Sequence, residues 1–136
     1  MTALGLALCL GFVSGLRVFT PVAAVLLVRG GTWGFVASIG AVFEYVIDLL
    51  PSTPSRTRPS GLAARAVSGA LVGWIISLRH GGSPAFGAVA GIAGAMIGAY
   101  GGLAGRRAAI TRIGAYPAAI VEDLVAIGLA ALIVTR

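Results

Sequence analysis

Apolar residues run through the chain in about five long stretches, separated by short polar connectors. The stretches cover residues 4–28, 33–50, 62–78, 84–104 and 117–134. A helix needs about 20 mostly apolar residues to cross the hydrocarbon core of a bilayer, and each stretch comes close to that length. The pattern predicts an all-α fold: a polytopic transmembrane helical bundle of about five spans, forming a single integral membrane domain over residues 1–136.

The connectors between the stretches differ in kind. Residues 29–32 and 79–83 are short enough for tight turns, whereas residues 51–60 hold three prolines and cannot remain helical. Residues 105–116 carry three arginines around a small apolar segment. This last pattern favours a separate short amphipathic helix at the membrane interface.

Composition supports a membrane protein and excludes a nucleic-acid partner. Hydrophobic residues make up 58% of the 136 residues, and the mean hydropathy is +1.01. The net charge of +6 comes from ten basic residues, all arginine, against four acids. These arginines are spread over short connectors and do not follow one basic face, so no nucleic acid is expected. The lone Cys9 cannot form an intramolecular disulfide.

Enzyme signatures are missing from the sequence. We find no Cys/His cluster with metal-ligand spacing, no nucleophile elbow, no phosphate-binding glycine loop and no HExxH helix. We therefore expect neither enzymatic activity nor a cofactor. No basic segment precedes the first apolar stretch, so the N-terminus is predicted to be a retained helix and not a cleaved signal.

The distribution of arginines predicts a multi-pass orientation in the cytoplasmic (inner) membrane. With the N-terminus inside, six arginines lie on the inner side: Arg56, Arg58, Arg65, Arg106, Arg107 and Arg112. Three lie on the outer side: Arg29, Arg79 and Arg136. This bias is modest, so dual topology in an antiparallel dimer stays open. In this topology the first two and last two spans run in opposite directions, which fits an inverted repeat.

All four acidic residues lie within the apolar stretches: Glu44, Asp48, Glu122 and Asp123. A carboxylate at membrane depth costs about 2.5 to 3.5 kcal/mol on insertion scales, so it usually pairs or marks an ion or substrate path. Glu44 and Asp48 are four residues apart and share a helix face. Asp48 could also simply reach interfacial water. Glu122 and Asp123 point about 100° apart, so they are not expected to serve one site equally. Glu122 shares its side with alanines only and is favoured for the interior, which leaves Asp123 a structural role.

Glu44 and Glu122 are predicted to lie at the same depth in the membrane, so that they could meet in one layer. Both lie roughly 8 to 9 Å below the same membrane surface at 1.5 Å per residue, and Arg65 falls near this level. Arg17 lies near the middle of the first span. Two arginines facing four acids leave a deficit of about two positive charges, which protons or a cation would fill. The alternative is an ion-pair network that only locks the bundle.

The segment from Ser14 to Pro21 predicts a kinked or broken first helix. Ser14, Arg17, Thr20 and Pro21 share one side, and Pro21 removes a backbone hydrogen bond while Gly15 loosens the preceding turn. Broken helices line cavities in transporters. Arg17 could hold an anionic substrate or a carboxylate of another helix, or the kink could be purely structural.

A ridge of glycines in the fourth stretch predicts close helix packing. Its members recur mostly at four-residue spacing: Gly87, Gly91, Gly94, Gly98 and Gly102. The ridge would serve either the core of the monomer or a dimer seam.

Three short motifs together resemble a family of small bacterial integral membrane proteins, catalogued only as a domain of unknown function. They are Gly15-Leu16-Arg17-x-Phe19-x-Pro21, Glu44-x-x-x-Asp48-x-x-Pro51 and Val121-Glu122-Asp123-Leu124. The likeness covers nearly the whole chain, but family members often carry a lysine where this chain has Leu49, so an ion-pair role for that lysine does not transfer. A fainter likeness is to cation/proton exchangers with Glu-x-Gly-Asp motifs. The family supplies no established activity.

Two hypotheses follow for function. The first is a small, dimeric transporter or channel, in which Glu44, Asp48, Glu122 and Asp123 bind a proton or cation while Arg17 and Arg65 balance the charge. The second is a structural or accessory subunit that packs against a larger membrane complex through the glycine ridge. The expected partners are the lipid bilayer, a second copy or a larger complex, and a proton, cation or small solute. The sequence identifies neither a metal nor a substrate.

Overall fold

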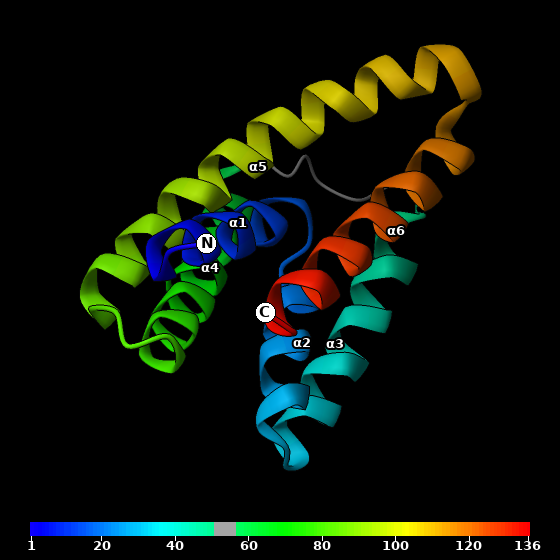
Figure 1. Cartoon of the computed structure of the whole chain (residues 1–136). Coiled ribbons are helices and arrows are strands. Elements are labelled where there is room, and N and C mark those ends of the chain that lie inside the picture. The colour runs from blue at the N-terminus through cyan, green and yellow to red at the C-terminus, as the bar shows by residue number, and fades with distance from the viewer. Residues whose placement is uncertain (51–56) are drawn as a thin grey trace.

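The computed structural model describes residues 1–50 and 57–136, and this part of the chain is all-helical. Its six helices are α1 (Ala3–Leu16), α2 (Phe19–Arg29), α3 (Thr32–Asp48), α4 (Pro59–Arg79), α5 (Pro84–Ile113) and α6 (Ala115–Val134) (Figure 1). The all-α prediction is confirmed. Most of the predicted proline-rich connector, including Arg56, lies outside the described residues.

Three helices are long and apolar enough to cross a membrane: α4, α5 and α6. The prediction of about five spans is therefore too high among the described residues. The first apolar stretch divides into α1 and α2, which have 14 and 11 residues. Helix α3 has only 17 residues and carries two acids. Hydropathy alone counts such segments as spans because it does not register a helix break.

Helix α5 is longer than predicted. It runs for 30 residues to Ile113, so the expected separate amphipathic helix in 105–116 is wrong: most of that segment forms the last turns of α5. The helix continues because alanine and arginine are good helix formers. It ends at Gly114, whose φ of 90° suits glycine best.

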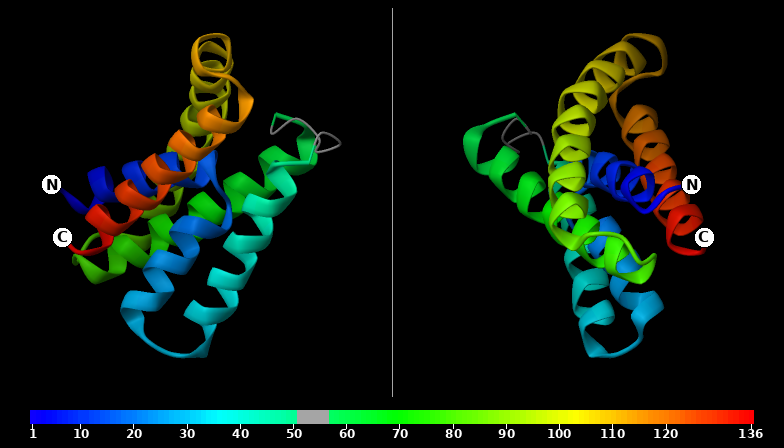
Figure 2. Two further views of the ribbon diagram at one scale, coloured as in Figure 1. Left: turned by 90° about the vertical axis from the view of Figure 1, so that its right-hand side faces the viewer. Right: turned by 60° about the vertical axis from the view of Figure 1, so that its left-hand side comes forward.

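Helices α1, α4 and α5 form a closely packed unit around the glycine ridge (Figure 2). A Cβ added to Gly91 would collide with the backbone of Gly69 on α4, and one added to Gly98 would collide with Phe12 on α1. Gly11 on α1 faces the backbone of Gly91 in the same way. Small residues thus allow three backbones to approach at a distance that no larger side chain permits. The ridge from Gly87 to Gly98 serves the core of the monomer.

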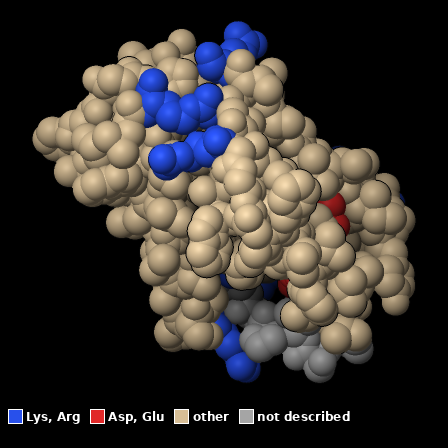
Figure 3. Space-filling model, turned by 90° about the horizontal axis from the view of Figure 1, so that it is seen from below, with Lys and Arg blue, Asp and Glu red and all other residues tan. Residues whose placement is uncertain are grey.

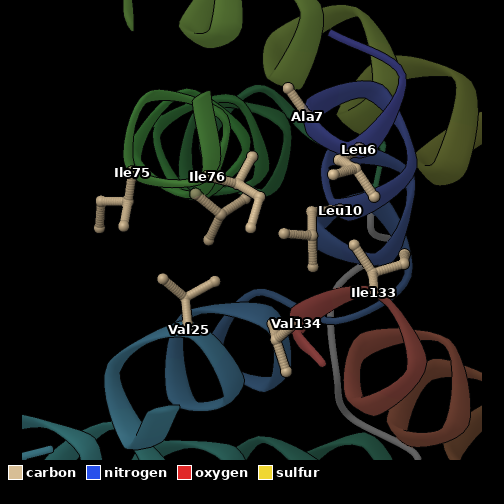
Figure 4. Close-up of a cluster of buried hydrophobic side chains, with 9 residues drawn as sticks. Leu6, Ala7, Leu10, Val25, Ile75, Ile76, Ile133 and Val134 are labelled. Carbon is tan, nitrogen blue, oxygen red and sulfur yellow. The ribbon is translucent and has the colours of Figure 1, made fainter. Parts of the chain in front are cut away.

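Helices α2 and α3 form a hairpin that projects away from the glycine-packed unit in both views of Figure 2. Helix α6 runs back from the end of α5 and packs against α1, α2 and α5. An apolar cluster joins the two parts, as Figure 4 shows. Its side chains come from α1, α2, α4 and α6: Leu6, Ala7, Leu10, Val25, Val72, Ile75, Ile76, Ile133 and Val134.

Candidate functional site

The predicted break in the first helix occurs between Leu16 and Phe19. A break leaves carbonyls without partners at the end of one helix and N–H groups without partners at the start of the next. Helix α4 satisfies the carbonyls: Arg65 Nε donates to the Gly15 carbonyl at 3.0 Å, and Ser68 Oγ donates to the Val18 carbonyl at 2.6 Å. Both side chains are buried. The break is therefore built into the packing against α4.

Glu44 of α3 satisfies the opposite side of the break. Its Oε1 accepts a hydrogen bond from the Val18 N–H at 2.7 Å, and its Oε2 accepts one from the Phe19 N–H at 2.9 Å. The carboxylate thus lies at the N-terminus of α2, where the helix dipole favours negative charge. The Phe19 ring packs against Gly40 on α3, where any Cβ would collide with it. These contacts fix the start of α2 to α3.

Arg17 lies at the centre of the break and is only 1% exposed. Its Nε donates to Asp123 Oδ1 at 2.8 Å, its Nη2 pairs with the same oxygen, and its Nη1 pairs with Asp48 Oδ2. The guanidinium carbon also lies 5.1 Å from the centre of the Tyr45 ring, a cation–π distance. Arg17 therefore joins carboxylates from two helices, α3 and α6, that are far apart in sequence.

Arg106 near the end of α5 adds a second positive charge. Its Nη1 lies 3.6 Å from Glu122 Oε2 and 3.9 Å from Asp48 Oδ2. In the sequence, Arg106 falls in a predicted interfacial connector and is not among the predicted site residues. The sequence does indicate that Arg106 shares a helix face with the glycine ridge, because it follows Gly98 and Gly102 at four-residue spacing. Recognising that α5 continues would have put it on the inward face.

The structure brings all six predicted site residues to the helix break, but it arranges them differently from the prediction. The depth argument put Glu44 and Glu122 at the centre, whereas Asp48 and Asp123 contact Arg17. Asp48 does more than reach interfacial water. Both adjacent acids of α6 face inward, because the side chains of Glu122 and Asp123 are 9% and 22% exposed. Arg65 donates to the backbone carbonyls of Gly15 and Gly61.

A cavity of about 340 Å³ adjoins this cluster. Glu44 and Asp48 line it together with apolar residues of α2, α3 and α4: Val18, Phe19, Gly40, Phe43, Ile47 and Ala64. Two of the four carboxylates thus border open space on one side and the helix break on the other. A small ion or solute in the cavity would reach them directly.

The carboxylates are not arranged as a metal cage. No group of three or more His, Cys, Asp or Glu side chains among residues 1–50 and 57–136 is placed to hold a metal ion. Guanidinium groups and backbone N–H groups occupy the carboxylate oxygens instead. The arrangement suits exchange between ion pairs, with a proton or cation competing for an oxygen that an arginine now holds.

The fold and the site define a membrane-embedded, all-helical protein with a buried charge cluster at a helix break. No protein-family model, no curated protein and no solved structure matches the chain. The function of the protein is therefore inferred from the residues of the site.

Proposed function

We propose that the chain is a small membrane transporter or channel, coupled to protons or cations through its intramembrane carboxylates. One observation carries the proposal: Arg17, buried at a broken helix, is bound by carboxylates from α3 and α6. A buried ion pair is costly to form and gives little net stability, so a rigid bundle gains little from it. A transporter uses such a pair because a proton or cation can replace the arginine as the partner of the carboxylate.

The mechanism follows from the contacts. Protonation of Asp123 or Asp48, or binding of a cation there, removes the negative charge that holds Arg17. Glu44 holds the start of α2 by its charge in the same way, so its neutralisation weakens the contact between α2 and α3. The α2–α3 hairpin and α6 then separate from the break. Arg65 and Ser68 keep the end of α1 fixed to α4.

The cavity beside Glu44 and Asp48 supports this reading, because it gives an ion space next to two of the carboxylates. We place the protein in the cytoplasmic membrane of a bacterium as a multi-pass homodimer. The inward-facing N-terminus belongs to the same proposal. The alternative, an accessory subunit of a larger complex, loses the free glycine ridge on which it depended, since Gly87 to Gly98 pack within the monomer.

Proton flux in proteoliposomes tests the proposal. Purified protein is reconstituted into vesicles that contain a pH-sensitive dye, and an imposed potential drives protons inward. We expect flux with the parent and a large loss in Asp48→Asn, Asp123→Asn and Glu44→Gln. Arg107→Gln is the matched control, because Arg107 is exposed and lies one residue beyond Arg106.

The outcomes separate the alternatives. Unchanged flux in all three variants would remove these residues from the mechanism. Absence of flux in the parent, together with co-purification of one stoichiometric partner, would favour the accessory subunit. Loss of flux with an unchanged unfolding midpoint would exclude a network that only locks the bundle.

A further inference from the structure

A second cavity, of about 440 Å³, forms an apolar trough between α2, α3 and α6. It lies within the range of about 300 to 1,000 Å³ that is typical of small-molecule sites. Alanine, valine, leucine and isoleucine make up most of its lining, and none of its lining residues carries a charge. A charged or strongly polar ligand would lose its hydration here without gaining a partner.

The few hydroxyl groups in the trough already have partners. Thr20 Oγ1 and Tyr45 OH share a hydrogen bond of 2.5 Å, Ser38 Oγ donates to the Gly34 carbonyl, and Thr135 Oγ1 donates to the Ala131 carbonyl. The trough therefore offers a ligand van der Waals contact and little else. Its occupant is an uncharged, apolar group.

The shape and setting identify that group. The trough runs from Thr20 to Val28 on α2, which is roughly 12 Å at 1.5 Å per residue. Leu27, Val42 and Ile127 in its lining are between 46% and 60% exposed, so it opens onto the apolar surface of the protein. For a membrane-embedded chain, the medium at this opening is hydrocarbon. An alkyl chain of a lipid fits an elongated apolar space of this kind.

Arginines gather at one end of the trough. Arg29 directly follows Val28, Arg136 directly follows Thr135, and Arg79 Nη1 lies 3.5 Å from the carbonyl of Val134. All three are exposed. Figure 3 shows several arginine groups close together at one edge of the face drawn there, with acidic groups visible only as small patches elsewhere. Arginine suits a lipid phosphate because it donates two hydrogen bonds in one plane.

We propose that the trough binds one acyl chain of an anionic phospholipid, whose phosphate pairs with Arg29, Arg79 or Arg136. The far end of the acyl chain reaches Tyr45, whose ring lies under Arg17. A bound lipid therefore contacts the charge cluster through one side chain, that of Tyr45. The lipid site does not depend on the proposed transport function, because its contacts are separate from the carboxylates.

Native mass spectrometry of the full chain, released from nanodiscs of mixed phosphatidylglycerol and phosphatidylcholine, tests the site. We expect the parent to retain one phospholipid, with phosphatidylglycerol preferred. Ala131→Trp fills the trough from an exposed lining position and should lower retention at least about tenfold. Ala93→Trp is the matched control, because Ala93 is exposed on α5 outside the trough and should retain the lipid.

The headgroup is tested separately. Combined Arg29→Gln, Arg79→Gln and Arg136→Gln should retain a lipid but lose the preference for phosphatidylglycerol, whereas Arg107→Gln with Arg112→Gln should keep it. Equal retention in the parent and Ala131→Trp, or no retained lipid in the parent, would overturn the site. An unchanged preference in the triple variant would overturn the arginine assignment. Because tryptophan could disturb folding, Ala131→Ile provides a smaller filling and should lower retention partially.

Discussion

The two halves of this molecule are held together by different physical means. In the unit of α1, α4 and α5, glycine removes side chains so that backbones touch, and polar contacts between α1 and α4 gather at the helix break, through Arg65 and Ser68. Around α2, α3 and α6, close contacts such as Phe19 against Gly40 are accompanied by buried charges and two cavities. Close packing resists deformation, whereas ion pairs can change partners. The comparison suggests a rigid scaffold joined to a region that rearranges.

The largest effect should come from Arg17, because its loss leaves two carboxylates without their shared partner. Removing one member of a buried ion pair costs about 3 to 5 kcal/mol. Arg17→Gln should therefore lower the free energy of unfolding by about this amount in a detergent titration. Arg107→Gln, at an exposed position, should change it by less than about 0.5 kcal/mol. Equal effects in the two variants would show that the charge cluster is not a structural unit.

The second largest loss of stability is expected in the scaffold formed by α1, α4 and α5, when a single methyl group is added to a glycine there. Gly91→Ala forces the backbones of α4 and α5 apart, and overpacking of this kind costs about 1 to 3 kcal/mol. Gly101→Ala lies on the same helix with open space around it, so it should gain up to about 1 kcal/mol from helix propensity. The thermal unfolding midpoints should move in opposite directions. A shared direction would contradict close backbone contact at Gly91.

Two buried serines on α4 differ in whether their hydroxyl groups have a hydrogen-bond partner, and this difference should appear in the stability of their alanine variants. Ser68 Oγ donates to the Val18 carbonyl at the break, whereas Ser77 Oγ has no hydrogen-bond partner among the described residues. Ser68→Ala should cost about 1 to 3 kcal/mol because a buried carbonyl loses its donor. Ser77→Ala should be neutral or slightly stabilising. Unfolding of both variants in the same detergent checks the difference, and a larger loss at Ser77 would refute it.

The smallest expected effect is at the hydroxyl pair above the trough. Tyr45→Phe removes the hydrogen bond to Thr20 but keeps the aromatic ring near Arg17. We expect a loss of about 0.5 to 1.5 kcal/mol, because one hydrogen bond of this type contributes about that much. Tyr45→Leu also removes the ring and should cost more. If both variants lost the same amount, the contact between the ring and Arg17 would contribute nothing measurable.

The helix break could be predicted from sequence because its causes are local. Gly15, Arg17 and Pro21 lie within seven residues of one another, and each disfavours an uninterrupted apolar helix. The unusual placement of the acids was also visible. Their partners were not, because which carboxylate meets Arg17 depends on how α3 and α6 pack. The tertiary fold decided between Asp123 and Glu122, which the sequence had ranked the other way.

The sequence prediction missed the number of spans and the role of Arg106 for a related reason. Hydropathy measures the apolar character of a segment and does not report where a helix bends or ends. Arg106 was assigned to a connector because the segment around it is polar, although alanine-rich residues carry α5 through it. The glycine ridge was recognised, but its partner helices, α1 and α4, emerge only from the packing.

The most direct test of the central claim is a distance measurement between spin labels in nanodiscs as the sample is acidified. The distance between labels at Val42 on α3 and Ala93 on α5 reports how the region of the charge cluster moves relative to the scaffold of α1, α4 and α5. Labels at Val67 on α4 and Ala93 report the scaffold alone, and all three positions are exposed. Protonation of the carboxylates should shift the first distance and leave the second unchanged. If the first distance stayed fixed while the carboxylates were protonated, or if both distances changed together, the division into scaffold and rearranging region would be wrong.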